Sequence, residues 1–370
     1  MNKGLISKSV FVLSVLLSLL LSPGSRAAEL GIQIVANELV LTWTSSGMVL
    51  QSAPTVTGTY TNLTGATSPH SLPITGDQRF FRLMATNLSP AGMVLIPDGS
   101  FIMGNTFAGE GEGDELPLHS VQVSACFLDR YEVTKALWDQ VFQWATNNGY
   151  SFEFADSGQG KATNHPAHSL TWHDAVKWCN ARSERENRLP AYYTDAGLTL
   201  PYKLGQVAPF VNWQAGYRLP TEAEWEKAAR GGNSGHRFPW DDTDDITHSR
   251  ANYYSMTNYV YDTSPTRESH PAFAVGGEPY TSPVDYFPAN DYGLHDMAGN
   301  AWEWTWDWHS IYSTGAQVDP RGPASGSFRI PRGGSWTSHA PFCRVTYRGS
   351  LSPTGRYYDI GFRCALPASP

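Results

Sequence analysis

Four short blocks in the second half of the chain combine large aromatic residues with glycine and arginine. They span residues 217–226, 299–304, 332–336 and 361–364. The 370 residues include 13 Trp, 34 Gly and 25 Pro, whereas charged residues make up only 16%. Glycine and proline interrupt regular elements, and large aromatic side chains bury much surface at a few positions. The sequence therefore predicts a loop-rich fold with aromatic anchors and excludes a helical bundle.

The four blocks contain the runs YRLPTEAEWE, GNAWEW, RGGSW and GFRC. In this order they resemble the formylglycine-generating-enzyme family, also called the sulfatase-modifying factors, and 93–104 is similar to the opening block of that family. The resemblance implies an α+β fold with little regular secondary structure, related to the C-type lectin fold. It also implies an activity, because family members use oxygen and copper(I) to oxidise a cysteine to formylglycine. That cysteine lies in a Cys-x-Pro-x-Arg segment of a sulfatase.

Residues 1–27 have the pattern of an export signal. Lys3 and Lys8 precede the apolar run 10–21, and small residues flank Arg26 before a cleavage site after position 27. The apolar run is short for a membrane span. We therefore expect an exported, soluble protein, periplasmic or extracellular, with no membrane span after signal cleavage. An uncleaved membrane anchor is the alternative.

Residues 29–84 predict a small all-β, sandwich-like module. Apolar and polar residues alternate with period two over 38–43, and turn-forming residues separate the further candidate strands. A linker is expected at 85–92, followed by the large domain at 93–367. The module is expected to be a spacer or a docking unit without chemistry of its own.

Three helices in the large domain are predicted from their N-terminal caps. Thr134 starts a helix to about Thr146. The run 171–174 resembles a capping box with Asp in place of Glu, and opens a helix to about Ser183. The run 221–224 fits the capping box better and opens the third helix.

The loop after the RGGSW block departs from the family. The resemblance places the two copper-binding cysteines of the family at positions where this chain has Ser338 and Cys343. A hydroxyl is a hard, poor ligand for copper(I), so copper is not an expected cofactor. The candidate catalytic residues are Cys343 and Ser335, which matches a serine of the active enzymes. A copper site made by His339 and Cys343 is the alternative.

The resemblance implies a structural calcium site at Asp296, Gly299, Ala301 and Glu303. Calcium takes six to eight oxygen ligands from carboxylates and carbonyls. Asp296 and Glu303 supply carboxylates, and the carbonyls of Gly299 and Ala301 can point the same way along an extended strand. The alternative is a turn that carries two carboxylates and no metal.

Four cysteines in an exported chain suggest disulfides. The resemblance aligns Cys179 and Cys364 with a structural disulfide of the family. Two possibilities remain for the other cysteines. Either Cys126 and Cys343 form a second bridge, or Cys343 is a free thiol.

The net charge of −8 argues against nucleic acid as a partner, because such binding needs a basic surface. Trp336, Ser338, His339 and Arg348 are expected to line a binding groove. Three functions stay open: a module that binds an extended peptide, a partner protein or a glycan; a formylglycine-generating oxidase; and an enzyme of changed chemistry in the same groove. The incomplete cysteine pair favours the binding module, although a fold alone does not fix function.

Overall fold

The computed structural model describes residues 30–36, 38–43, 48–55, 60–63, 65–74, 79–85 and 90–368. The chain forms two compact units, Met1–Leu88 and Ser89–Pro370. The predicted export signal lies outside the described residues. Among the described residues, no helix has the length and apolar character to span a membrane.

The amino-terminal unit contains two antiparallel three-stranded sheets, with the strand orders β1-β2-β5 and β4-β3-β6. Leu41 of one sheet and Leu50 and Phe81 of the other belong to one buried apolar cluster. The two sheets therefore share a core, as in a sandwich. The strands are β1 Gly31–Val35, β2 Glu38–Thr42, β3 Met48–Ala53, β4 Thr61–Asn62, β5 His70–Pro73 and β6 Phe80–Ala85.

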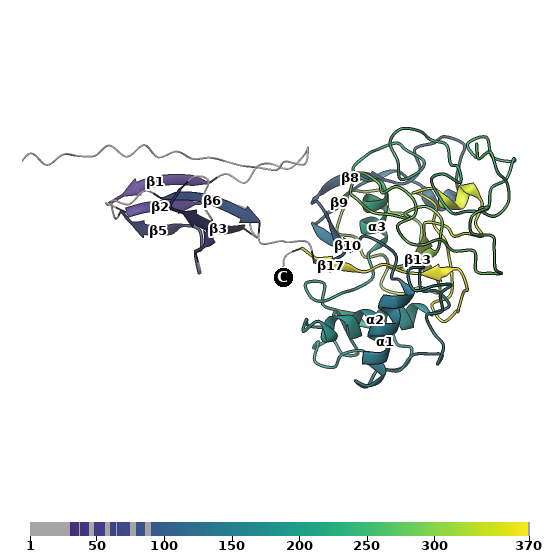
Figure 1. Cartoon of the computed structure of the whole chain (residues 1–370), viewed down its shortest axis with the longest axis horizontal. Coiled ribbons are helices and arrows are strands. Elements are labelled where there is room, and N and C mark those ends of the chain that lie inside the picture. The colour runs from purple at the N-terminus through teal and green to yellow at the C-terminus, as the bar shows by residue number, and fades with distance from the viewer. Residues whose placement is uncertain are drawn as a thin grey trace, which may run out of the picture. The chain divides into compact units, whose positions relative to one another are not determined.

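The second unit has an α+β fold in which short strands and three helices are joined by long irregular segments (Figure 1). The helices are α1 Lys135–Thr146, α2 Trp172–Arg185 and α3 Glu222–Ala229. The strands are β7 Met93–Ile96, β8 Gly99–Met103, β9 His119–Val123, β10 Cys126–Asp129, β11 Tyr192–Tyr193, β12 Phe210–Val211, β13 Trp302–Trp308, β14 Gln317–Val318, β15 Arg329–Arg332, β16 Ile360–Gly361 and β17 Ala365–Pro367. Two 3-10 turns are η1 Gly113–Glu115 and η2 Ala340–Cys343.

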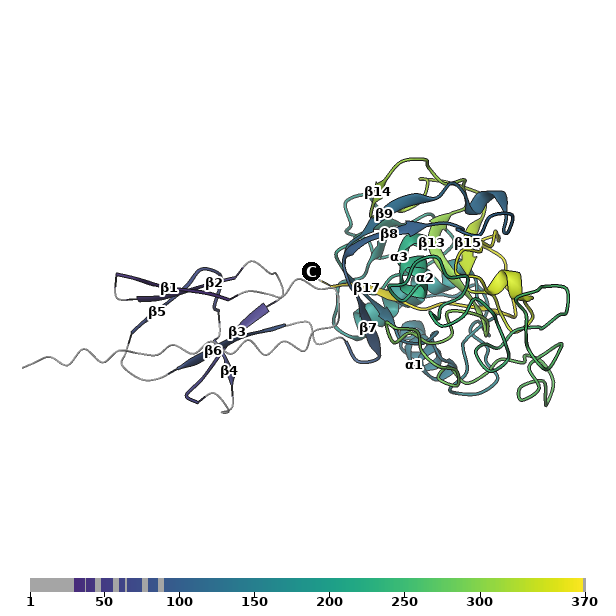
Figure 2. The ribbon, with the colours of Figure 1, turned by 90° about the horizontal axis from the view of Figure 1, so that it is seen from above.

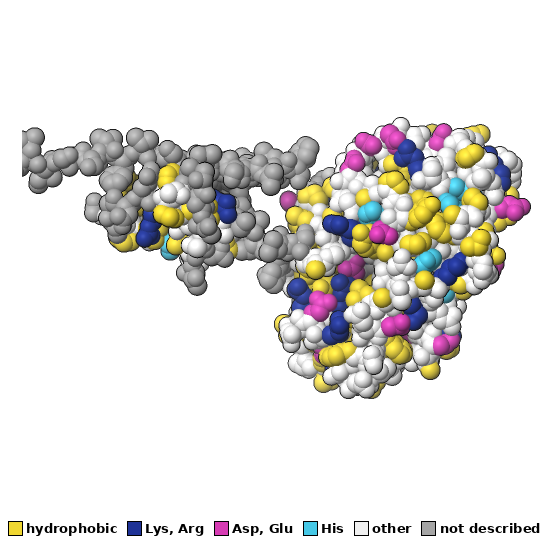
Figure 3. Space-filling view, viewed as in Figure 1, with side chains coloured by type: hydrophobic (Ala, Val, Ile, Leu, Met, Phe, Trp, Pro, Cys, Tyr) yellow, Lys and Arg dark blue, Asp and Glu magenta, His cyan; other side chains and the backbone are white. Residues whose placement is uncertain are grey.

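Three sheets frame this unit. Their strand orders are β17-β10-β7, β15-β13-β16 and β14-β9-β8. Helix α3 contacts β8, β9, β13 and β15, and helices α1 and α2 pack on each other. Figures 1 and 2 show α1 apart from β8 and β9, with β17 between them. On the face drawn in Figure 3, acidic and basic side chains are interspersed with neutral ones.

The predicted helix starts are confirmed, because each cap is a local interaction that the sequence carries. Thr134 accepts a hydrogen bond from the backbone N–H of Leu137 at the start of α1. Complete capping boxes open α2 and α3. The cap residue and the third helical residue thereby satisfy N–H groups that the helix itself leaves free.

Tryptophans fill the main core of the second unit. Trp138 of α1 and Trp178 of α2 stack with ring centroids 5.8 Å apart, and both are fully buried with Trp172 and Trp304. Strand β13 brings Trp304 into this core. The aromatic anchors expected from the composition therefore join α1, α2 and the central sheet.

Candidate functional site

The segment that follows β15 makes a tight turn on two glycines. Gly333 and Gly334 have φ values of 93° and 77°, which residues with a Cβ atom rarely adopt. A Cβ atom on Gly334 would lie 2.8 Å from the Sγ atom of Cys343. The glycine therefore lets Cys343, in η2, approach the backbone directly before Ser335.

Ser335 lies in a network of hydroxyl groups around one carboxylate. Its Oγ donates to Oδ2 of Asp359 over 2.9 Å, and the Oγ1 of Thr337 donates to the same oxygen over 3.1 Å. The Oγ of Ser338 accepts a hydrogen bond from the backbone N–H of Ser335 and lies 3.1 Å from the Oγ of Ser335. Burial raises the pKa of Asp359. The sequence analysis missed Thr337 and Asp359, because no local pattern marks a carboxylate 24 residues along the chain.

Cys343 is fully buried in an apolar cluster with Ala298, Ala340 and Tyr253. Burial, followed by the nearby Asp262, raises the pKa of its thiol. The thiolate is the form of cysteine that binds metals, so metal binding at Cys343 requires loss of the thiol proton. The donor set for copper(I) would thus be one buried thiol and the hydroxyl of Ser338, which does not fit a soft cation.

Three of the four expected groove residues lie together. Trp336 packs with Tyr280 and Tyr358 at centroid distances of 5.2 and 5.9 Å, and His339 packs with Tyr254 at 5.6 Å. Trp336 and Ser338 are mostly buried, whereas Tyr358 is 57% exposed. Tyr280 and Tyr358, which both pack on the buried Trp336, therefore form an aromatic surface beside the hydroxyl network.

Arg348 is not part of this aromatic surface. Its guanidinium group forms two hydrogen bonds with the carboxylate of Glu222, of 2.6 and 2.8 Å, and donates to the carbonyls of Asp114 and Ser310. Its side chain is 2% exposed. Arg348 supports α3 and lines a different cavity, together with Glu222 and Tyr312.

The residues expected to bind calcium lie just before and at the start of β13, and their two carboxylates differ in hydrogen bonding. Glu303 is fully buried, and its two oxygens accept hydrogen bonds from Arg363 and from the indole N–H of Trp225. Both carboxylate oxygens of Asp296 are buried without a hydrogen-bond partner. Burial, with Glu303 adding to it, raises the pKa of Asp296. Asp296 thus fits a cation, whereas Glu303 already has partners.

The backbone of the predicted calcium segment is held by other groups. The N–H of Gly299 donates to the carbonyl of Gly333, and the N–H of Ala301 donates to Glu132. Glu132, which the sequence analysis missed, also accepts a hydrogen bond from the side chain of Asn300. Within the described part of the chain, no three His, Cys, Asp or Glu side chains form a metal-binding group. Calcium at this position stays a prediction.

Cys179 and Cys364 are neighbours in the main core. Their sulfur atoms lie 3.7 Å apart, and both side chains are fully buried. A bonded pair has its sulfurs about 2.05 Å apart, so the structure places them adjacent but not linked. Cys126 and Cys343 lie in different apolar clusters and are also unlinked.

We predict that Cys179 and Cys364 are linked in the oxidised protein. In the chain-entropy model, a bridge over so long a loop contributes about 4–5 kcal/mol to the free energy of unfolding. Peptide mapping under non-reducing conditions is expected to recover the two cysteines in one linked fragment. Recovery of both as free thiols from protein kept under air contradicts the prediction.

Comparison with known proteins places this architecture in a family. A family model described as a sulfatase-modifying factor enzyme 1-like domain matches residues 81–368. The chain belongs to the sulfatase-modifying factor family. The resemblance expected from the four sequence blocks is therefore confirmed.

Several sulfatase-modifying factors are similar over most of their length. The formylglycine-generating enzyme of Bos taurus is 32% identical over 76% of this chain and 76% of its own. The formylglycine-generating enzyme of Thermomonospora curvata is 34% identical over 74% of this chain and 93% of its own. Among solved structures, Treponema denticola variable protein 1 superposes with a TM-score of 0.57 at 29% identity, over 79% of this chain and 96% of its own. The predicted α+β fold is confirmed by this likeness.

Proposed function

We propose that this chain is an exported, non-oxidising member of the sulfatase-modifying factor family that binds a ligand on its aromatic surface. One observation supports the proposal: Ser338, where the resemblance places one of the two copper-binding cysteines of the family, is part of a hydroxyl network. Ser338 is tied to Ser335 by two contacts, of 3.0 and 3.1 Å. Copper(I) would have to displace these contacts, and hydroxyl groups bind copper(I) poorly.

The surface beside this network supports binding. Tyr280 and Tyr358 provide large rings with polar edges, both packed on the buried Trp336, and Tyr358 is more than half exposed. The indole N–H of Trp336 is buried without a hydrogen-bond partner. Aromatic side chains with polar edges are common in contacts with proteins, peptides and sugars. The ligand classes proposed are an extended peptide, a partner protein or a glycan, and the amino-terminal pattern supports a periplasmic or extracellular location.

An oxidation assay tests the proposal. The protein is loaded with copper(I) and mixed under oxygen with a Cys-x-Pro-x-Arg peptide, and the aldehyde is measured by mass spectrometry. The Thermomonospora curvata enzyme serves as the positive control. We expect no more aldehyde from this protein than from its own Cys343→Ser variant, because one buried thiol and one hydroxyl hold copper(I) weakly.

A second variant tests whether the absence of a thiol at position 338 explains the weak binding of copper(I). Ser338→Cys restores two sulfur donors and is expected to raise the affinity for copper(I) above that of the native protein. Equal copper affinity for the native protein and for Ser338→Cys contradicts this explanation.

Formylglycine formation is the second candidate function. It is favoured by the identity to formylglycine-generating enzymes and by the presence of Ser335 and Cys343. Multiple turnovers by the native protein, abolished in Cys343→Ser, would establish this function and overturn the proposal.

A further inference from the structure

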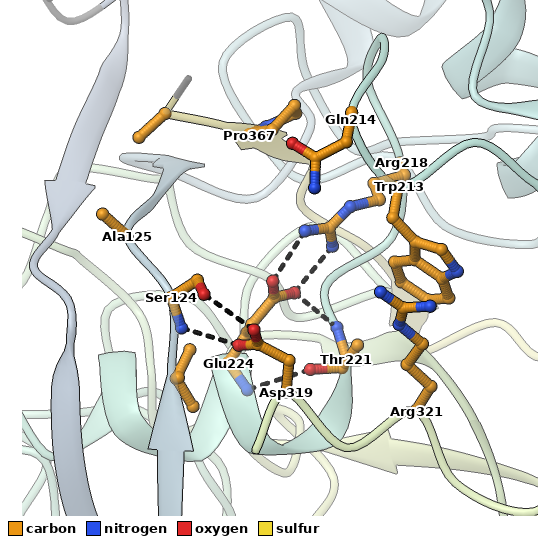
Figure 4. Close-up of a pocket in the computed structure, with 12 residues that line it drawn as sticks. Ser124, Ala125, Trp213, Gln214, Arg218, Thr221, Glu224, Asp319, Arg321 and Pro367 are labelled. Carbon is orange, nitrogen blue, oxygen red and sulfur yellow. Dashed lines mark hydrogen bonds and ion pairs between the residues drawn. The ribbon is translucent and has the colours of Figure 1, made fainter. Parts of the chain in front are cut away.

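A polar cavity of about 260 Å³ lies in the second unit, away from the segment that carries Ser335 (Figure 4). Its walls come from five places in the chain: the link from β9 to β10, the loop before α3, the first turn of α3, the loop after β14, and the end of β17. None of the lining residues belongs to the hydroxyl network or to the aromatic surface. The cavity is therefore separate from the residues that the oxidation reaction of the family would use.

Two of the four charges in the cavity neutralise each other. Arg218 and Glu224 form two parallel hydrogen bonds of 2.6 Å, and both side chains are nearly buried. Glu224 also closes the capping box of α3 with Thr221. A bidentate pair of this kind is strong and is not readily opened by a ligand. Arg218 and Glu224 therefore form the rigid floor of the cavity.

The other two charges, Arg321 and Asp319, form no ion pair at contact distance in the described part of the chain. Arg321 lies over the ring of Trp213, 4.3 Å from its centroid, and forms neither a hydrogen bond nor an ion pair there. Stacking on the indole fixes the guanidinium plane and leaves its N–H groups available for an anion. Partial burial and the nearby Arg218 lower the pKa of Arg321, and a bound anion would offset both effects.

Asp319 is the matching negative charge. Its carboxylate accepts hydrogen bonds of 2.6 and 2.7 Å from the backbone N–H and the hydroxyl of Ser124, which are neutral donors. Asp319 has a φ of 43°, and its own N–H donates to the carbonyl of Gln122. The carboxylate is thus held in place by neutral donors and forms no ion pair at contact distance. In Figure 4, Asp319 points toward Ser124 and Arg321 toward Trp213, so the two face different sides of one cavity.

We propose that this cavity binds a small zwitterion, an amino acid or a dipeptide, with its carboxylate on Arg321 and its ammonium group on Asp319. The amide of Gln214, which points into the cavity in Figure 4, supplies a further hydrogen bond. Ala125 and Pro367 provide an apolar wall for an aliphatic side chain.

Other ligand classes fit the cavity less well. A simple anion would meet the unneutralised carboxylate of Asp319 at short range, which disfavours it. A sugar would need the indole face of Trp213, and Arg321 lies over that ring. A zwitterion satisfies both unpaired charges at once, and charge-assisted hydrogen bonds are the stronger kind.

Isothermal titration calorimetry on the purified protein tests the proposal with four probes. These are L-leucine, L-leucyl-L-leucine, L-leucinamide and N-acetyl-L-leucine. Leucinamide lacks the carboxylate and N-acetyl-leucine lacks the ammonium group, so each removes one of the two charge contacts. We expect the amino acid or the dipeptide to bind and each blocked probe to bind at least about tenfold more weakly.

Matched variants locate the binding. Arg321→Gln and Asp319→Asn are expected to weaken binding about tenfold or more. Arg130→Gln, which changes an exposed arginine outside the cavity, is expected to leave binding unchanged. The proposal is overturned if neither L-leucine nor L-leucyl-L-leucine binds at millimolar concentration, if a blocked probe binds as well as its parent, or if Arg130→Gln weakens binding as much as Arg321→Gln.

Discussion

Glu303→Ala is expected to lower the free energy of unfolding of the second unit by about 3–5 kcal/mol. Glu303 and Arg363 are both fully inaccessible, and their two hydrogen bonds measure 2.6 and 2.7 Å. The substitution leaves the guanidinium group of Arg363 buried without the carboxylate that accepts its hydrogen bonds. It also removes the acceptor of the indole N–H of Trp225. Denaturant unfolding followed by tryptophan fluorescence measures the loss.

An exposed ion pair provides the control for the Glu303 experiment. Asp242 pairs with Arg250 at the surface, and the side chain of Asp242 is 58% exposed. Asp242→Ala is expected to cost about 0–1 kcal/mol, because solvent screens exposed pairs. A loss at Glu303 no larger than the loss at Asp242 contradicts the assignment of a strong buried pair.

The partner of Glu303 can also be removed. Arg363→Met alone leaves a buried carboxylate and is expected to be strongly destabilising. The double variant Glu303→Gln/Arg363→Met removes both charges of this pair, and we expect it to lose less stability than either Glu303→Ala or Arg363→Met.

The same variants separate the ion pair from the predicted calcium site. If calcium binds at Asp296 and Glu303, a chelator lowers the melting temperature of the native protein, because ligand binding adds to stability. If Glu303 binds no calcium, the chelator has no effect while Glu303→Ala still destabilises. The carboxylate of Asp296 accepts no hydrogen bond and is therefore available to a cation. Both oxygens of Glu303 already accept hydrogen bonds from Arg363, so Glu303 is not a free ligand for that cation.

Sequence reasoning succeeded where the interaction is local. Thr134, Thr171 and Thr221 each cap a helix through groups within three residues, so the sequence pattern contains the whole interaction. The family resemblance succeeded because its blocks are long and ordered. Neither kind of argument finds partners that are distant in the chain.

Arg348 illustrates that limit. Its position after the RGGSW block predicted a place beside Trp336 and Ser338, yet its partner Glu222 lies 126 residues away, at the start of α3. The cavity of Arg321 and Asp319 was missed for the same reason, because five separate segments form it. No spacing rule in the sequence brings position 124 beside position 319, and only the assembled sheet β14-β9-β8 does so.

Gly299→Ala is expected to destabilise the second unit by more than Gly293→Ala, with a difference of about 1–3 kcal/mol. The φ values are 80° for Gly299 and 85° for Gly293, so both substitutions carry a similar backbone strain. They differ in surroundings. A Cβ atom on Gly299 would lie 2.3 Å from the carbonyl oxygen of Asn252, whereas the nearest atom at Gly293 is a side-chain methyl 4.0 Å away.

The contact at Gly299 has consequences for the whole segment that opens β13. The carbonyl of Asn252 accepts the N–H of Asn300, and Gly299 itself donates to Gly333 at the turn before Ser335. The neighbours of Gly299 on both sides are backbone groups. Rotation of a side chain therefore cannot relieve the close contact that the added methyl group makes. Unfolding curves of the two variants, recorded side by side, measure the difference. Equal losses would mean that the segment of Asn252 moves aside freely, and that the glycine of the GNAWEW block serves backbone conformation alone and not the close approach of two chain segments.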